Sequence, residues 1–254
     1  MKLPATPSFR LDGKRALITG GSRGIGLAAA VALAEAGAAV TIAARTADAV
    51  DAAVAALRAA SFTADGLVFD VTDGPGATAA IEKAGPFDIL VNSAGGGRHN
   101  TFLDTPEADV RAVLDMNVTG LMVVSQAVAK ALIALGRPGS IIHISSQMGH
   151  VSAPKRAVYS ASKFAVEGLT KGMAIELGPH GIRVNTICPT FIETELTAKN
   201  LSIPAFRAWV LDRIKLGRLG KVEDIMGPVV FLASDASALM TGSALMVDGG
   251  WTAE

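Results

Sequence analysis

The chain has 254 residues, of which half are hydrophobic and 18% are charged, and its 23 basic side chains balance 23 acidic ones. This globular composition excludes a disordered chain, and the balanced charge gives no electrostatic basis for binding nucleic acid. The single cysteine, Cys188, cannot form an intrachain disulfide, which favours a cytoplasmic location. The start of the chain lacks the apolar core of a signal peptide. Polar residues interrupt the most apolar stretch, 118–136, so we expect a buried helix there and no membrane span.

Short apolar runs alternate with helical patterns along the whole chain. The runs predicted to form strands are 15–19, 39–44, 66–70, 88–92, 140–145, 182–187 and the start of 244–250. Near-continuous apolar strands separated by helices are typical of parallel strands that are buried on both faces. The predicted fold class is therefore α/β, a Rossmann-type doubly wound parallel sheet of about seven strands flanked by helices. No shift in composition divides the chain, so we expect one domain over 1–254.

The helices between these strands have recognisable starts and ends. They are predicted over 24–37, from an N-cap at Thr46 to 60, over 75–84, from Thr105-Pro106 to about 135, from the segment that holds Tyr159 to 178, and as two helices within 204–234. At Thr105-Pro106 we expect a threonine N-cap with proline at the first helical position.

A glycine-rich turn, TGGSRGIG (19–26), joins the first strand to the first helix. Glycine lets the backbone turn tightly and approach a pyrophosphate, while the helix N-terminus offers free N–H groups and a positive dipole end. The spacing alone is weak evidence, and a glycine turn without a ligand is the alternative. Its place between a strand and a helix predicts a dinucleotide site with contacts at Gly20, Ser22, Arg23, Gly24, Ile25 and Gly26.

The end of the second strand bears on the choice between NADP and NAD. An acidic residue there would hold the adenosine ribose, but the sequence reads Ala43-Ala44-Arg45. Arg45 and Arg23 offer two guanidiniums that suit a 2′-phosphate, so we expect NADP(H), with NAD(H) as the alternative. Asp70 and Asn92 end the third and fourth strands, where they could meet adenine, fix a loop, or act as ordinary turn residues.

Three further features could carry chemistry. Tyr159, the single tyrosine, precedes Lys163 by four positions, which places both on one helix face. Ser145 and Ser146 precede that tyrosine by 14 and 13 positions, at the end of the fifth strand. Asn117 lies mid-helix, which asparagine disfavours. Each feature alone is weak, because surface pairs and polar loop residues are common.

Together these features resemble the short-chain dehydrogenase/reductase family. The motifs that carry the resemblance are T-G-x3-G-I-G at 19–26, N-S-A-G at 92–95, Asn117, Ser146, Tyr159-x3-Lys163, GRLGKVEDI at 217–225 and V-D-G-G at 247–250. They span nearly the whole chain, in order and at the spacing of the family. The 13-residue spacing of the family selects Ser146 over Ser145.

The resemblance implies a role for each catalytic residue. Tyr159 is the acid/base, Ser146 hydrogen-bonds the substrate oxygen, and Asn117 supports a water in a proton relay. Lys163 binds the nicotinamide ribose and lowers the pKa of Tyr159. A cation ~4 Å away is worth roughly 4 kcal/mol at an effective dielectric of ~20, or about 3 pK units. Lys163, helped by the positive charge of the oxidised nicotinamide, is therefore expected to bring the phenol pKa near ~7.

The resemblance also implies further cofactor contacts. It places adenine contacts on Asp70 and Val71, nicotinamide carboxamide contacts on Ile192 and Thr194, and others on Asn92, Ala94, Gly95, Tyr159, Lys163 and Pro189. Two residues depart from the family pattern: Ser93 replaces an asparagine and Thr190 replaces a glycine. These departures concern fine cofactor geometry, and no metal site is expected.

The substrate is predicted to be a small carbonyl or alcohol, and its identity stays open. A 3-oxoacyl-type ketoreductase acting on a thioester-carried substrate is the main reading. A sugar, sugar-acid or polyol dehydrogenase is the alternative, and a dinucleotide-binding regulatory protein is the non-enzyme alternative. Family position implies a lid over about 190–215 and substrate contacts at Gln147, His150, Phe191 and Trp209. Lys155 and Arg156 are expected in a solvated turn, with attraction of an anionic substrate as the alternative. The resemblance also implies a homotetramer.

Overall fold

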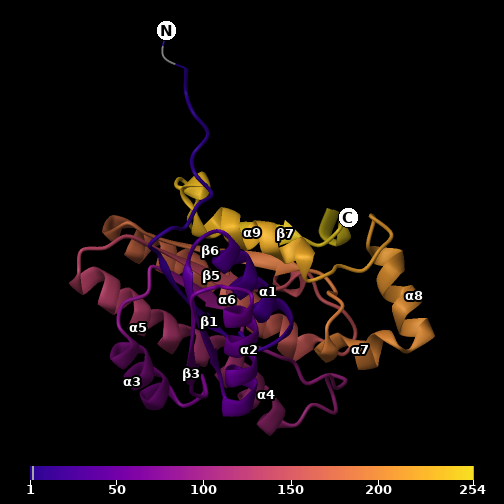
Figure 1. Ribbon diagram of the computed structural model, residues 1–254. Coiled ribbons are helices and arrows are strands. Elements are labelled where there is room, and N and C mark those ends of the chain that lie inside the picture. The colour runs from indigo at the N-terminus through magenta and orange to yellow at the C-terminus, as the bar shows by residue number, and fades with distance from the viewer. Residues whose placement is uncertain (2, 254) are drawn as a thin grey trace.

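A single sheet of seven parallel strands runs through the computed structural model, which describes every residue except Lys2 and Glu254 (Figure 1). The strands are β1 (Arg15–Thr19), β2 (Ala39–Ala44), β3 (Ala64–Val68), β4 (Ile89–Asn92), β5 (Gly139–Ile144), β6 (Ile182–Pro189) and β7 (Ala244–Val247). Their order is β3-β2-β1-β4-β5-β6-β7, and all six pairings are parallel. This order confirms the predicted doubly wound α/β fold.

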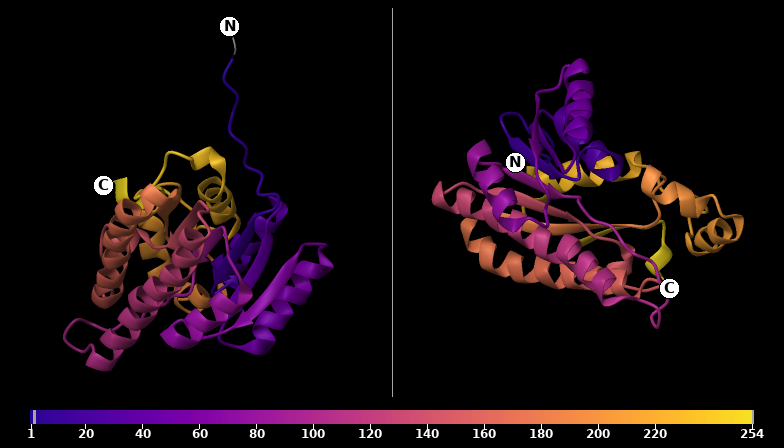
Figure 2. Two further views of the ribbon diagram at one scale, coloured as in Figure 1. Left: turned by 90° about the vertical axis from the view of Figure 1, so that its left-hand side faces the viewer. Right: turned by 90° about the horizontal axis from the view of Figure 1, so that it is seen from below.

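Helices cover both faces of the sheet (Figure 2). They are α1 (Gly24–Glu35), α2 (Ala47–Ala59), α3 (Gly74–Ala84), α4 (Glu107–Leu114), α5 (Leu121–Ala134), α6 (Ala157–Leu177), α7 (Glu195–Leu201), α8 (Pro204–Arg213) and α9 (Glu223–Ala233). Helices α1, α2 and α9 pack into the core on one face, and α3, α5 and α6 pack into the core on the other.

Successive strand residues supply the two cores in turn. Ile18 and Ile142 belong to the core under α1 and α9, whereas Leu17 and Ile141 belong to the core under α5 and α6. All four are fully buried. This is why the strands lack a polar alternation: a parallel sheet covered on both faces has no solvated side.

The long helix predicted from Thr105-Pro106 to 135 differs from the observed one. Pro106 occupies the N-cap, whereas the Thr105 hydroxyl donates to the Thr101 carbonyl. The helix is also interrupted by a π-helical turn, Asp115–Gly120, between α4 and α5. At Gly120 a Cβ atom would lie 2.7 Å from the Val71 carbonyl oxygen, so the helix passes very close to the loop after β3.

Smaller differences lie at the edge of the sheet and in the lid. Strand β3 ends at Val68, two residues before the predicted end, because Asp70 already accepts a hydrogen bond from the Thr72 amide in a turn. The lid contains α7 in addition to α8, and α7 has no counterpart among the predicted helices. Figure 1 shows both lid helices standing off the main body beside the end of the sheet.

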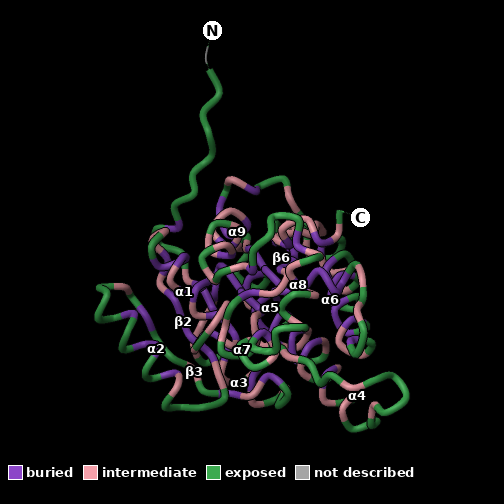
Figure 3. Tube along the Cα trace, turned by 90° about the vertical axis from the view of Figure 1, so that its right-hand side faces the viewer, coloured by how far each residue is buried: buried purple, intermediate pink, exposed green. Residues whose placement is uncertain are grey.

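One helical stretch, Glu107–Ala134, is long and apolar enough to cross a membrane by length and composition alone. Half of its most apolar window is buried inside the protein. Val124, Val128 and Leu132 on α5 pack in the core, which agrees with the buried helix expected from the sequence. In Figure 3 the buried segments gather around the sheet, while α4 and the lid run through exposed positions.

Candidate active site

The carboxyl ends of the strands open into a cleft of about 800 Å³. It lies where the strand order reverses, between β1 and β4, which is where ligands bind in open α/β sheets. Of the residues predicted to bind the cofactor, those that line the cleft are Gly20, Ser22, Arg23, Gly24, Ile25, Gly26, Arg45, Asp70, Val71, Ala94, Gly95, Tyr159, Lys163, Pro189, Ile192 and Thr194. The structure therefore gathers nearly all of them around one space.

The glycine loop after β1 is packed too closely for side chains. Gly20 has a φ of +62°, and a Cβ atom there would lie 2.8 Å from the Ala94 nitrogen. A Cβ atom on Gly26 would lie 2.2 Å from the Gly20 carbonyl oxygen. Arg23 occupies the N-cap of α1 and makes no side-chain cap bond, so the first N–H groups of the helix stay free for an anion. This cradle fits the pyrophosphate of a dinucleotide.

Two arginines stand at this end of the cleft. Arg45 lies 3.7 Å from Asp70, and Arg23 lies 3.7 Å from Glu195 on α7. Burial alone would raise the pKa of Asp70, but its hydrogen bonds with Thr72 and the Arg45 charge hold that pKa below its usual range. Both guanidiniums are mostly exposed, so they remain accessible to a phosphate.

Tyr159 and Lys163 lie one turn apart on α6, at the inner wall of the cleft. The Lys163 ammonium is 5.7 Å from the centre of the Tyr159 ring and donates a 2.8 Å hydrogen bond to the Ile144 carbonyl. Burial lowers the pKa of Lys163 to about 8, against the opposing effect of Cys188 and Glu167. Ser146 follows β5 and donates to Gln147 at 2.7 Å. The three predicted catalytic groups thus meet at one wall.

The lowering of the Tyr159 pKa that is predicted for Lys163 together with an oxidised nicotinamide stays a prediction. Burial raises the pKa of Tyr159, and the groups that oppose the rise are Ser146, through a hydrogen bond, and Arg156, through its charge. The ammonium of Lys163 donates to the Ile144 carbonyl, and a pKa of about 8 leaves it mostly charged at pH 7. Arg156 is thus a further cation near the phenol, in addition to Lys163 on the same helix.

Asn117 lies in the π-helical turn, which explains its unusual mid-helix position. Its amide donates to the Gly96 carbonyl and to Ser162 Oγ, both at 2.9 Å, while its Oδ1 accepts from the Gly96 amide at 3.0 Å. The π-turn thus turns Asn117 toward the loop after β4 and toward α6. Its predicted part in a proton relay stays a prediction.

Asn92 does not line the cleft. Its amide donates to Ser125 at 2.9 Å and lies 3.2 Å from the Nδ1 atom of His143, inside the core. Burial lowers the pKa of His143 to about 3, so that imidazole is neutral. Because the Asn92 side chain is buried among strand and helix groups, it supports the start of the loop from inside the core, and its predicted cofactor contact stays a prediction.

On the substrate side, Gln147 and Phe191 line the cleft, whereas His150 and Trp209 do not. The Trp209 ring stacks on the Phe206 ring with centroids 5.8 Å apart and meets the Trp251 ring with centroids 5.6 Å apart. These three rings form the aromatic cluster of the lid. His150 points instead toward Cys188 and Glu167. The resemblance to the family identified the segments that form the substrate side, but it did not predict the orientation of the His150 and Trp209 side chains.

Two residues of the substrate wall lie outside the predicted set. Arg156, expected in a solvated turn with attraction of an anionic substrate as the alternative, is only 9% exposed and lines the cleft. Its guanidinium lies 6.0 Å from the Phe206 ring and makes no hydrogen bond or ion pair with any residue that the structure describes. His99 meets the Tyr159 ring edge-on at 6.1 Å. Burial, with a contribution from Arg156, lowers the pKa of His99 to about 4, so its imidazole is neutral.

The fold and this wall define a dinucleotide-dependent oxidoreductase. A family model described as "Enoyl-(Acyl carrier protein) reductase" matches residues 20–252. D-erythrulose reductase from Gallus gallus is 42% identical over 245 residues, 96% of this chain and 98% of that protein. Gluconate 5-dehydrogenase from Gluconobacter oxydans (strain 621H) is 42% identical over 248 residues, 96% of each chain. The chain belongs to the short-chain dehydrogenase/reductase family.

A solved structure supports the same assignment. A gluconate 5-dehydrogenase from Burkholderia cenocepacia J2315, in complex with NADP and tartrate, is 42% identical with a TM-score of 0.94 and covers 97% of this chain and 98% of its own. This chain is an oxidoreductase that acts on CH–OH groups, as predicted. The main prediction, a 3-oxoacyl-type ketoreductase, is not supported, because the names of these relatives describe reactions of sugars and sugar acids. The alternative prediction, a sugar, sugar-acid or polyol dehydrogenase, fits them better.

Proposed function

We propose that this protein is an NADP(H)-dependent dehydrogenase that interconverts a secondary alcohol and a ketone on a sugar acid. The single observation that carries the substrate class is Arg156. A nearly buried guanidinium without a hydrogen-bond or ion-pair partner among the described residues is costly, because the charge has lost water and gained no anion. A substrate carboxylate would supply that anion through two parallel hydrogen bonds.

The surroundings of Arg156 suit a short polyhydroxylated chain. Neutral His99, Gln147 and Thr190 line the same cleft and can exchange hydrogen bonds with hydroxyl groups. A long acyl chain would need an apolar channel, whereas Phe206 and Trp209 are engaged with each other in the aromatic cluster. These observations favour a sugar acid over a thioester-carried acyl chain.

The catalytic wall then performs proton transfer. Tyr159 donates its phenolic proton to the carbonyl oxygen in reduction and removes the hydroxyl proton in oxidation, and Ser146 donates a hydrogen bond to the same oxygen. Lys163 is placed to bind the ribose of the cofactor, and the Asn117 contacts hold the Gly95–Gly96 loop against it. The nicotinamide supplies or accepts the hydride when bound.

Two observations support NADP(H) as the cofactor. Arg45 and Arg23 line the adenosine end of the cleft, and β2 carries no carboxylate at its end. Three structural neighbours were solved with NADP, at 42%, 39% and 36% identity. The cytoplasmic location and the homotetramer remain predictions.

Steady-state kinetics with Arg156→Gln test the substrate class. For reduction of 5-keto-D-gluconate with NADPH, we expect KM to rise about tenfold or more, because a charge-assisted pair is lost. For neutral D-erythrulose we expect KM to change by less than about twofold. The matched control is Lys155→Gln, which removes the adjacent exposed charge and should leave both values unchanged. Because Arg156 also acts on the Tyr159 phenol, a change in kcat is expected with both substrates, and the test lies in KM. An equal rise of the two KM values would favour a neutral ketose or polyol as the substrate.

A further inference from the structure

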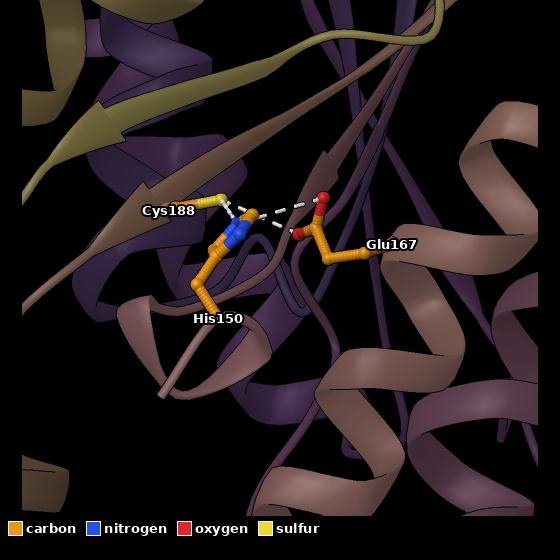
Figure 4. A group of neighbouring side chains, drawn as sticks. All are labelled: His150, Glu167 and Cys188. Atoms are coloured by element: carbon orange, nitrogen blue, oxygen red, sulfur yellow. Dashed lines mark hydrogen bonds and ion pairs between the residues drawn. The ribbon is translucent and has the colours of Figure 1, made fainter. Parts of the chain in front are cut away.

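A second group of chemically active side chains lies behind the catalytic wall. His150 follows the short 3-10 turn Gln147–Gly149, Glu167 lies on α6 one turn beyond Lys163, and Cys188 lies near the end of β6. Figure 4 shows the three side chains pointing toward one another from these three elements. None of them lines the cleft.

The ligand atoms of this group are spaced as a metal ion requires. Cys188 Sγ is 3.5 Å from His150 Nε2 and 3.3 Å from Glu167 Oε1, and His150 Nε2 is 3.8 Å from Glu167 Oε2. A tetrahedral Zn²⁺, with bonds of about 2.0–2.1 Å to N and O and about 2.3 Å to S, holds such atoms roughly 3.3–3.6 Å apart. Shifts of a few tenths of an ångström would complete the coordination.

A fourth polar atom lies beside the group without a partner. Ser145 is 4% exposed, and its Oγ completes no hydrogen bond within the described part of the chain. It lies next to the Cys188 thiol, and an interaction with that thiol, which acts to lower the pKa of Cys188, takes the place of a hydrogen bond of ordinary geometry. A Cβ atom on Gly149 would sit 3.2 Å from this Oγ and 3.0 Å from Glu167 Cγ, so the absence of a side chain there keeps the space between them open. A buried unpaired hydroxyl points to a missing partner.

The surroundings also meet the other needs of a metal site. Thr186 Oγ1 donates to Glu167 Oε2 at 3.0 Å and so orients the carboxylate from outside. The His150 side chain is 34% exposed, which leaves a path from solvent, whereas Glu167 and Cys188 are buried.

An alternative to a metal site is that Cys188 is a reactive thiol. Burial and the neighbouring Glu167 raise the pKa of Cys188 to about 12, so without a metal the thiolate that nucleophilic or oxidative chemistry needs is scarce. A purely internal hydrogen-bond network is the remaining interpretation. In it Cys188 Sγ donates to Glu167 and contacts Thr186 Oγ1 at 3.3 Å and Ser145, but His150 has only long contacts, at 3.5 and 3.8 Å.

We propose that His150, Glu167 and Cys188 bind one Zn²⁺ ion, with Ser145 Oγ or a water as the fourth ligand. Nitrogen, oxygen and sulfur ligands in one tetrahedral group suit this borderline-soft cation. The ion would tie the loop after Ser146 to α6, which carries Tyr159 and Lys163, and so would hold the catalytic wall together. This inference does not depend on the substrate class proposed above.

Cobalt titration of the untagged full chain, freed of metal with a chelator, tests the site. Co²⁺ should produce visible bands of a tetrahedral site and a near-ultraviolet thiolate-to-cobalt charge-transfer band, at one ion per chain. Since Cys188 is the single cysteine, the charge-transfer band can arise only from this residue. Zn²⁺ should abolish both bands by competition and should raise the Tm of the protein, because it binds the folded state.

Variants separate the site from chance binding. Cys188→Ser should abolish the charge-transfer band, and His150→Ala, at a partly exposed position, should weaken cobalt binding by about tenfold or more while the fold is retained by circular dichroism. The control His180→Ala removes an exposed histidine after α6 and should change neither value. Absence of the charge-transfer band at millimolar Co²⁺, or its persistence in Cys188→Ser, would overturn the proposal.

Discussion

The cofactor side and the substrate side of the cleft are built in different ways. The cofactor side consists mainly of backbone: glycines after β1, the free N-terminus of α1 and the loop after β4. The substrate side consists of side chains from four separate segments, among them His99, Gln147, Arg156 and Phe191. A site built from backbone needs particular residues at fixed spacing, whereas a site built from side chains depends on the orientation of each side chain. The first kind is therefore read more directly from a sequence than the second, of which only Gln147 and Phe191 were predicted correctly to line the cleft.

The lid shows the same contrast. Its aromatic residues Phe206 and Trp209 pack on Trp251, near the C-terminal end of the chain, instead of facing the substrate. Arg156 lies over Phe206 and faces the cleft without an ion-pair partner in the described chain. The substrate wall thus depends on contacts between segments about fifty residues apart in sequence.

Removal of the phenolic hydroxyl, where the two sides meet, should have the largest effect. We expect Tyr159→Phe to lower kcat by roughly 10²–10⁴-fold, the usual contribution of a general acid/base, while NADPH still binds. Stopped-flow turnover and quenching of tryptophan fluorescence by the cofactor measure the two quantities. Turnover within about tenfold of the unmodified protein would rule out the phenol as proton donor.

A methyl group in the glycine cradle should disrupt the geometry of the cofactor side of the cleft and leave the substrate side unchanged. Gly26→Ala places its Cβ atom 2.2 Å from the Gly20 oxygen, so the loop must shift. We expect a loss of about 1–3 kcal/mol in the free energy of unfolding. We also expect cofactor binding to weaken by roughly tenfold or more.

The matched control for the cradle is Gly172→Ala on α6, where a Cβ atom meets nothing within 4 Å. Alanine should there raise the free energy of unfolding by about 0.5–1 kcal/mol and leave cofactor binding unchanged. Urea unfolding and NADPH titration give both values. Equal behaviour of the two variants would refute close packing as the reason for glycine at position 26.

Loss of one arginine should change cofactor choice by a smaller amount. Arg45→Ala should weaken NADPH binding by roughly tenfold, ~1.4 kcal/mol, and leave NADH binding nearly unchanged, because only NADPH carries the 2′-phosphate. Arg58→Ala, which removes an exposed arginine on α2 paired with Asp65, is the control. Tighter binding of NADH than of NADPH by the unmodified protein would contradict the assignment.

The smallest effect is expected beside the lid, at the ion pair of Arg218 with Asp224. Hydrogen bonds from Arg218 and the Lys221 amide lower the pKa of Asp224 from 3.8 to about 2. A lowered folded-state pKa gives stability that is present above pH 3.8 and is lost as the pH falls toward about 2. Since Arg218 is 55% exposed, Arg218→Ala should cost only about 0.5 kcal/mol at pH 7.

Urea unfolding at pH 7 and at pH 2 measures the contribution of the Arg218–Asp224 pair to the free energy of unfolding. The difference between Arg218→Ala and the unmodified protein should shrink at the lower pH, because the protonated carboxyl no longer attracts the guanidinium. A difference that grows as the pH falls would show that Arg218 acts through something other than Asp224.

The sequence by itself predicted the sheet and the glycine cradle, and its resemblance to the family picked out Ser146, Tyr159 and Lys163, which the structure brings to one cleft. Periodicity reports burial, and a pyrophosphate cradle requires glycines directly between a strand and a helix, so both leave a local trace. The same local logic marked Asn117 as unusual, although the π-turn that explains it depends on close packing of Gly120 against Val71.

Only the tertiary structure decided how side chains from distant segments face one another. It turned Asn92 inward, Trp209 into the aromatic cluster, His150 toward Cys188, and Arg156 into the cleft beside Tyr159. None of these orientations has a local signal, because each is set by which neighbours exclude water from that side chain. The pKa of the catalytic phenol belongs to the same class, since it depends on burial and on a charge that the fold brings near.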